Sequence, residues 1–203
     1  MGLDYSYLLY FHRNQMWNAL QAVVGISAQH TPPTRVLFPD HVLAVPLATW
    51  SSNDHQLQSD AAQLDFHFSI YFDEDQAILD YLRRLGDEEI LRSPPGSEHE
   101  HQISIGYIYL SIYQHIPEYP NSELVLFNFG TTGTRMSLLF SESESIRRTF
   151  VQLLEKYGGV IGIFDWENDY GELFWFKGNP MQVSLSSNYM LPDEIEAELK
   201  RGW

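Results

Sequence analysis

The chain has 203 residues, of which 44% are hydrophobic and 14% aromatic, and its 12 Lys and Arg against 27 Asp and Glu give a formal net charge of −15. This apolar content can bury a sizeable core, but no apolar run reaches the roughly 18 to 20 residues of a membrane-spanning helix. Scattered cations argue against a nucleic-acid or anionic-membrane surface, and the lack of cysteine excludes disulfides and thiol chemistry.

Two features indicate where the protein resides. The N-terminal residues lack the basic start and apolar centre of a secretion signal, because Asp4 interrupts them. The lack of cysteine also fits a reducing compartment. We therefore expect a cytoplasmic protein that forms one globular domain over residues 1–203.

The first predicted element is a strand whose sequence recurs. Residues 3–15 (LDYSYLLYFHRNQ) return as residues 64–76 (LDFHFSIYFDEDQ), and more faintly as residues 135–144 (RMSLLFSESE). Alternate side chains share one face of a strand, so each copy has one apolar face. That face holds Leu3, Tyr5, Tyr7, Leu9 and Phe11, then Leu64, Phe66, Phe68, Ile70 and Phe72, then Met136, Leu138 and Phe140. The alternation is typical of an antiparallel or mixed sheet covered on one side.

A helix is predicted directly after each copy of the strand. Asp73 and Gln76 have the spacing of a capping box, in which a side-chain oxygen accepts from first-turn amides. Ser141 and Glu144 have the same spacing. Apolar residues then recur at helical intervals. The glycines expected to end the three helices are Gly25, Gly86 and Gly158.

Two more strands are predicted after each helix, because β-branched and aromatic runs flank turn residues. These hairpins pair residues 35–38 with 42–47, 103–113 with 123–129, and 160–166 with 172–177, while 49–63 and 87–102 are expected to be loops. The result is an α+β fold of three βαββ-like units, at 3–48, 64–129 and 133–177. They form a mostly antiparallel or mixed sheet with helices on one face, and a C-terminal helix follows at 192–201.

One short segment offers candidate metal ligands. Glu98, His99, Glu100 and His101 are four ligand-type residues in a row, and His99 and His101 would project to one side of an extended strand. A zinc site needs three or four ligands in imposed geometry, and the helical His-Glu-x-x-His motif is absent. A solvated loop is the competing interpretation.

Other motifs are incomplete. Asp165, Glu167 and Asp169 alternate as in an EF-hand loop, but Tyr170 and Phe176 stand where that loop needs glycine and glutamate. Residues 130–134 (GTTGT) could present amides to an anion, yet we expect them to join two strands with no helix following. No nucleophile elbow, Walker loop or dinucleotide fingerprint occurs, so we expect no cofactor and favour a non-enzymatic role.

One predicted surface is unusual for a solvated sheet face. Asp is depleted in strands, yet Asp4 and Asp65 take equivalent positions opposite the apolar face. The tyrosines and histidine expected beside them are Tyr10, His67, Tyr71, Tyr107, Tyr109 and Tyr113. Aromatic rings interleaved with carboxylates make good recognition surfaces. Ordinary solvated strand residues are the competing interpretation.

Two functions are compatible with these features. The preferred one is a non-enzymatic protein whose acidic, tyrosine-rich surface binds a basic protein, as an inhibitor or immunity protein does. The alternative is a metal-dependent enzyme or small-molecule-binding protein with a site assembled from Asp65, His67, His99 and His101. The acidity also serves to keep an aromatic-rich chain soluble.

Overall fold

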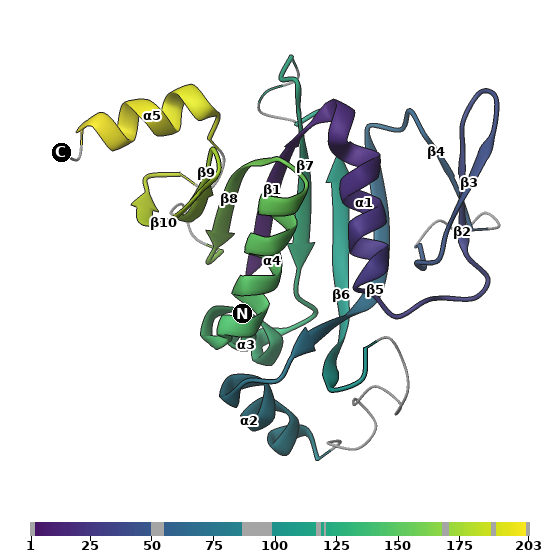
Figure 1. The fold of residues 1–203 in the computed structure, drawn as a ribbon, viewed down its shortest axis with the longest axis horizontal. Helices are drawn as coiled ribbons and strands as arrows, with labels where there is room; N and C mark the ends of the chain where they lie inside the picture. The colour runs from purple at the N-terminus through teal and green to yellow at the C-terminus, as the bar shows by residue number, and fades with distance from the viewer. Residues whose placement is uncertain are drawn as a thin grey trace.

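The computed structural model describes residues 3–49, 55–86, 99–116, 119, 121–167, 171–187 and 190–201. Within them the chain forms a seven-stranded sheet, a three-stranded sheet and five α-helices (Figure 1). The predicted α+β class is therefore confirmed. No helix in these residues is both long enough and apolar enough to cross a membrane.

The main sheet consists of β1 (Ser6–His12), β5 (Gln63–Asp73), β6 (Gln102–Tyr113), β7 (Leu124–Gly130), β8 (Gly159–Asp165), β9 (Gly171–Phe176) and β10 (Asn179–Leu185). The small sheet consists of β2 (Thr34–Leu37), β3 (Val42–Val45) and β4 (Gln56–Gln58). The helices are α1 (Met16–Gly25), α2 (Gln76–Leu85), α3 (Thr134–Glu142), α4 (Glu144–Lys156) and α5 (Pro192–Arg201). A 3-10 turn, Arg13–Gln15, precedes α1.

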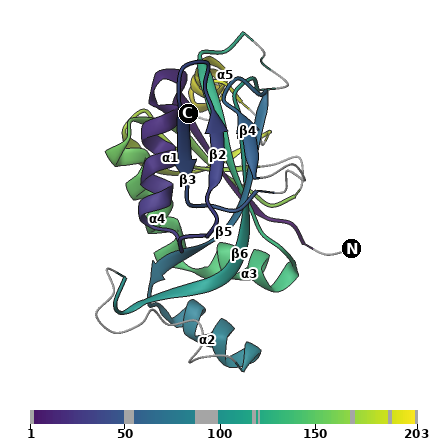
Figure 2. The same ribbon diagram turned by 90° about the vertical axis from the view of Figure 1, so that its right-hand side faces the viewer.

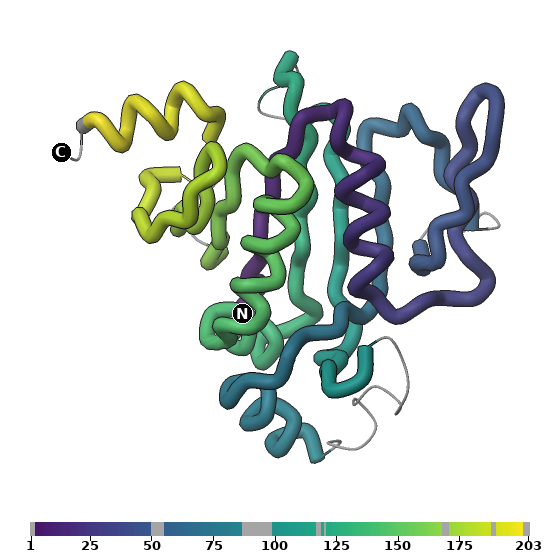
Figure 3. The backbone as a smooth tube through the Cα atoms, viewed as in Figure 1, coloured from purple at the N-terminus to yellow at the C-terminus, as the bar shows by residue number. Residues whose placement is uncertain are grey.

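The first strand lies at the centre of the main sheet, whose order is β10-β9-β8-β1-β7-β6-β5 with antiparallel neighbours. Tyr7 of β1 stands opposite Phe129 of β7 and Phe164 of β8. Figure 3 shows this N-terminal segment running between parts of the chain that come much later in the sequence. The three predicted hairpins are the pairs β2–β3, β6–β7 and β8–β9, and all three are confirmed.

Helices α1 and α4 cover one face of the main sheet (Figure 2). The predicted apolar face of β5 is buried there, from Leu64 to Phe72 at every second residue. Tyr7 joins the same core, where its ring stacks on Phe150 of α4 at a centroid distance of 4.4 Å. Its hydroxyl donates to the Phe140 carbonyl at 3.1 Å, so the one buried polar atom of this ring is bonded.

The opposite face of β1 is also buried, contrary to the expectation of a sheet covered on one side. Leu8 and Tyr10 belong to a second core with Ile195 of α5. The C-terminal helix therefore contributes to the core on the second face, and its side chains also bond Lys177 and Ser186, which flank β10. A central strand that is buried on both faces has a continuous apolar sequence. Within the described residues, the second face of β5 and β6 has no helix in this core.

The prediction of a strand at the third copy of the repeat is wrong, because residues 134–142 form the helix α3. Met136, Leu139 and Phe140 are buried at helical spacing, whereas Leu138 is 40% exposed. The segment RMSLLFSE has no β-branched residue and is made mostly of residues that favour helices. In chain order the first two segments are β1-α1-β2-β3 and β5-α2-β6-β7, but β2 and β3 lie in the small sheet apart from β1, and the third segment is ααββ.

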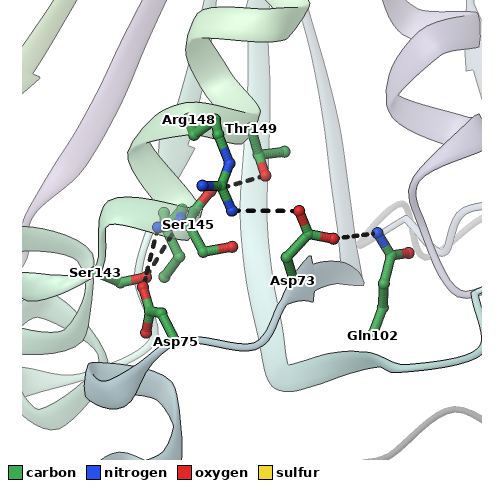
Figure 4. Close-up of polar contacts among 8 residues, drawn as sticks. Asp73, Asp75, Gln102, Ser143, Ser145, Arg148 and Thr149 are labelled. Carbon is green, nitrogen blue, oxygen red and sulfur yellow. Dashed lines mark hydrogen bonds and ion pairs between the residues drawn. The ribbon is translucent and has the colours of Figure 1, made fainter.

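One carboxylate links α2 to α4 (Figure 4). The N-cap of α2 is Asp75, not the predicted Asp73, and it accepts from the Ile78 amide at 2.9 Å. The same side chain accepts from the Ser143 hydroxyl at 2.7 Å and the Ser145 amide at 3.0 Å. Ser143 in turn caps α4 through the Ile146 amide, which corrects the predicted capping box at Ser141.

The small sheet and its connections border the β5 edge. The Ala48 carbonyl accepts from the His67 amide at 2.9 Å, and the Ser69 carbonyl accepts from the Ala28 amide at 2.8 Å. These contacts satisfy backbone groups that an edge strand otherwise exposes. Strand β4 lies inside the predicted loop 49–63, and residues 87–98 of the second predicted loop lie outside the described residues.

Candidate functional site

A bulge in β6 turns its tyrosines outward. Gly106 has φ +102°, and the register with β5 shifts beside it, between Ser69 and Tyr71. Before the bulge Ile103 and Ile105 point into the main core. The buried residues after it are the even-numbered Ile108, Leu110 and Ile112. Because one extra residue inverts the alternation, the odd-numbered tyrosines of β6 fall on the opposite face.

The outward residues of β5 and β6 form a surface that we call the tyrosine face. It consists of Asp65, His67 and Tyr71 of β5 with Tyr107, Tyr109 and Tyr113 of β6. His67 stands opposite Tyr109, and Ser69 stands opposite Tyr107. Tyr107 is 61% exposed and Tyr109 is 39% exposed, whereas the other four are half-buried. The structure thus brings together six of the eight residues predicted for a binding surface.

Contacts within the tyrosine face hold several side chains in place. The Asp65 carboxylate accepts from the Ser111 hydroxyl at 2.6 Å and from the Gln63 amide at 2.7 Å. The ring of His67 meets Tyr107 edge to face at 6.0 Å between centroids. Side chains fixed in this way lose little conformational entropy when a partner binds.

Tyr10 and Asp4 do not belong to the tyrosine face. Tyr10 is only 1% exposed and lies in the second core, so its predicted place on an open surface is wrong. Asp4 lies beside Asp165 and Glu167, a group that we call the acidic corner. The Asp4 amide donates to Glu167 Oε2 at 2.8 Å, and the Glu167 amide donates to Asp165 Oδ1 at 2.8 Å.

The acidic corner concentrates negative charge. Burial and the charge of Glu167 raise the pKa of Asp4. Burial also raises the pKa of Asp165, the hydrogen bond from the Glu167 amide lowers it, and the charges of Glu167 and Asp4 raise it, so that the net pKa shift is upward. A cation placed beside these carboxylates would stabilise their ionised forms.

The acidic corner and the tyrosine face share one side of the main sheet. Asp165 stands opposite Ser6, Ser6 opposite Gly130, and Gly130 opposite Tyr109. Three steps between neighbouring strands separate Asp165 from Tyr109, or about 14 Å. The seven strands of this sheet contain no Lys or Arg. Arg147, which bonds Glu172, lies over the Phe174 ring on the first core.

The candidate metal ligands are separated. The ring of His99 stacks on Tyr71 at 4.4 Å, and its Nδ1 lies 2.9 Å from Gln102 Oε1. The His101 side chain is 90% exposed. Tyr71 follows His67 by four residues, about 13 Å along a strand, so His99 does not lie with His67.

Within the described residues, no three His, Asp or Glu side chains come together in a way that could hold a metal ion. Glu98, the first ligand of the predicted row, lies outside those residues.

Sequence reasoning missed two histidines near His67. The rings of His30 and His55 lie 6.3 Å apart, and the His55 carbonyl accepts from the Arg35 amide of β2 at 2.7 Å. Burial lowers the pKa of His67, and the positive charge of His30 lowers it further. Both missed residues stand in irregular segments without periodicity, so no pattern in the sequence could have placed them there.

The GTTGT segment was expected to join two strands, but it precedes a helix, because α3 begins at Thr134. Its polar groups bind the N-terminal segment. Thr134 Oγ1 accepts from the Leu3 amide at 3.0 Å, and Ser137 Oγ donates to the Leu3 carbonyl at 2.8 Å. Thr131 Oγ1 lies 2.6 Å from Ser137 Oγ. These contacts give the loop a structural use that requires no bound anion.

No family model matches the chain, and no curated protein or solved structure matches it either. The chemistry of the tyrosine face and the acidic corner is therefore the basis for assigning a function.

Proposed function

We propose that the protein is a non-enzymatic module that binds a basic protein through the tyrosine face and the acidic corner. One observation carries the proposal: the open side of the sheet combines exposed Tyr107 and Tyr109 with carboxylates, on strands that contain no Lys or Arg. A surface of this composition attracts cationic partners and repels acidic ones.

The two parts of this side have different physical roles. Tyrosine rings offer a large contact area at low entropic cost, and the side chains of Arg and Lys gain about 0.5 to 1 kcal/mol from lying over an exposed aromatic ring. Tyr107 and Tyr109 are therefore the expected anchors. The carboxylates of Asp4, Asp65 and Asp165 supply the charge that accelerates association.

An inhibitor or immunity-type role is consistent with this chemistry. A net charge of −15 creates a field over the whole protein that draws in a cationic surface. A partner that uses its basic surface to act on other molecules would lose that surface once the tyrosine face covers it. The protein needs no catalytic group for such a role.

The tyrosines are tested by comparing what tagged variants retain from a lysate. We expect the unmodified protein to retain a basic protein at about 50 mM salt and to release it at about 500 mM salt, because screening weakens exposed charge pairs. The Tyr107→Ala/Tyr109→Ala double variant should fail to retain it. Val42→Ala removes an exposed apolar side chain from the small sheet and is the matched control.

The charges are tested with the partner so obtained. Asp4→Asn/Asp165→Asn should slow association several-fold, whereas Asp40→Asn/Asp60→Asn makes the same change in net charge at exposed positions outside the main sheet and should slow it less. If the Tyr107→Ala/Tyr109→Ala double variant retains the partner as well as the unmodified protein does, the tyrosine face is not the binding surface. Equal slowing by the two charge variants would show that net charge alone is responsible.

A further inference from the structure

A second site lies at the other end of the main sheet. A groove of about 770 Å³ opens where β1 and β9 end and where β7 and β8 begin. The end of α4 borders one side and the start of α5 the other (Figure 1). Its apolar lining comes from Leu124, Leu154, Val160, Trp175, Leu191 and Pro192. This volume is in the range of sites that bind small organic molecules.

The walls of the groove belong to regular elements held close together. A Cβ atom at Gly159 would lie 2.8 Å from the Cα of Leu154, so only glycine allows α4 to end this close to β8. The Trp175 indole nitrogen donates to the Gly159 carbonyl at 2.9 Å, which fixes the ring in the floor. Gly158 and Gly178 add no side chains to fill the space. The groove is thus largely preformed.

The rim of the groove carries an excess of carboxylates. Its single lysine, Lys177, is bonded to Glu196 of α5. Glu194 accepts from the Tyr119 hydroxyl and the Leu191 amide, both at 2.7 Å.

Three further carboxylates remain on the rim: Glu123, Glu155 and Asp193. Within the part of the chain that the structure describes, these three side chains make no hydrogen bond or ion pair. Glu123 immediately precedes β7, Glu155 belongs to α4 and Asp193 to α5, so a positive group on the apolar floor meets negative charge from several directions.

We infer that this groove binds a small organic cation with an apolar body and one ammonium group. The body would lie against Leu124, Val160 and Leu191, and the ammonium group would face Glu123, Glu155 and Asp193. An anion with the same body is rejected by the rim charge, and a neutral analogue lacks the attraction. The site is separate from the tyrosine face, which lies on β5 and β6.

The test uses n-octylammonium, octanoate and octanol as probes of the full-length, isotopically labelled protein. Octylammonium should shift the backbone NMR signals of Gly158, Gly159 and Gly178, with a Kd in the millimolar range or tighter. Octanoate should bind at least about tenfold more weakly, since the excess of carboxylates on the rim repels its negative charge. Octanol should fall between them.

Two variants make the same charge change at different places. Glu155→Gln on the rim should weaken octylammonium binding about threefold, as expected for one exposed carboxylate. Glu142→Gln at the end of α3 should not change it.

Three results would overturn the inference: octanoate binding as tightly as octylammonium, no shift of the groove glycines up to about 10 mM probe, or shifts centred on the acidic corner instead. Asp4→Asn must leave binding in the groove unchanged, so failure here leaves the proposed role of the tyrosine face to be judged on its own experiments.

Discussion

The carboxylate of Asp75 lies 2.7 Å from the hydroxyl of Ser143, a residue 68 positions later in the chain. Each residue is the N-cap of a helix, α2 for Asp75 and α4 for Ser143. Asp75 also accepts from the Ser145 amide, so one side chain satisfies donors at two helix ends. One carboxylate therefore connects the starts of α2 and α4, which belong to the second and third units.

Replacing Asp75 should destabilise the fold strongly. Asp75→Ala removes the cap of α2 and leaves the Ser143 hydroxyl and Ser145 amide without their acceptor. We expect a loss of about 2 to 3 kcal/mol in the free energy of unfolding, measured by urea denaturation. Asp73→Ala, two residues earlier, breaks only exposed contacts with Arg148 and Gln102 and should cost about 0.5 kcal/mol. Equal losses would contradict the double cap.

The contribution of Asp75 should depend on pH. Burial raises the pKa of this carboxyl, but hydrogen bonds from Ile78, Ser145, Ser143 and Ala77 outweigh burial and lower it overall. A lowered pKa means that the folded state favours the charged form. This stabilisation is complete above the unfolded pKa of about 3.9 and is lost as pH falls through the lower folded pKa. The difference in the free energy of unfolding between wild type and Asp75→Ala should therefore become smaller at acidic pH.

The bulge at Gly106 should be intolerant of a side chain. Gly106→Ala forces a β-carbon onto a residue with φ +102°, which we expect to cost about 1 to 2 kcal/mol in thermal or urea unfolding. Gly130→Ala on neighbouring β7 is the control, because a Cβ there meets nothing within 4 Å and its φ is not in the left-handed region. If Gly106→Ala leaves the free energy of unfolding unchanged, the bulge that places the β6 tyrosines on the outer face does not require glycine.

Truncating Tyr10 and truncating Tyr107 should change the free energy of unfolding by very different amounts. Tyr10 is buried in the second core, and Tyr10→Ala should cost about 3 to 5 kcal/mol in the free energy of unfolding. Tyr107 is exposed, and Tyr107→Ala should change stability by about 0.5 kcal/mol or less. A small effect at Tyr10 would contradict the burial of this side chain in the second core.

Neutralising the acidic corner should stabilise the protein. Because the pKa of Asp165 is raised by burial and by Glu167 and Asp4, its ionised form is disfavoured in the folded state. Above the raised pKa this costs stability, and below about pH 3.9 the cost is gone. Asp165→Asn should therefore raise the melting temperature at pH 7 but not at pH 3. Asp60→Asn, an exposed control, should change neither value.

Local patterns in the sequence predicted most of the elements. The strict alternation from Leu64 to Phe72 identified β5 and its buried face, because that strand has one apolar side. The alternation of Met136, Leu138 and Phe140 led to the wrong prediction of a strand, because Met136, Leu139 and Phe140 fit the apolar stripe of a helix equally well. The missing β-branched residues of this segment are the signal that favours the helix.

The site was harder to predict than the elements. Tyr107 and Tyr109 could be assigned to one side of their strand from spacing alone, and they are exposed there. Tyr10 is buried in a second core that includes Ile195 of α5, a residue more than 180 positions later in the chain, and α5 carries no sequence signal of where it packs. The grouping of Asp4 with Asp165 likewise depends on strand order, which periodicity does not encode.

The central position of β1 has a consequence for how the chain acquires its fold. Tyr7 cannot meet both of its neighbours until Phe129 and Phe164 have been made. At about 5 to 20 residues per second, that wait lasts on the order of 8 to 30 seconds during synthesis. Contacts this distant in sequence also make for slow collapse into the native topology. Both strands of the β5–β6 pair are synthesised before β7 and β8, so β1 is synthesised first but is among the last strands that can take its place in the main sheet.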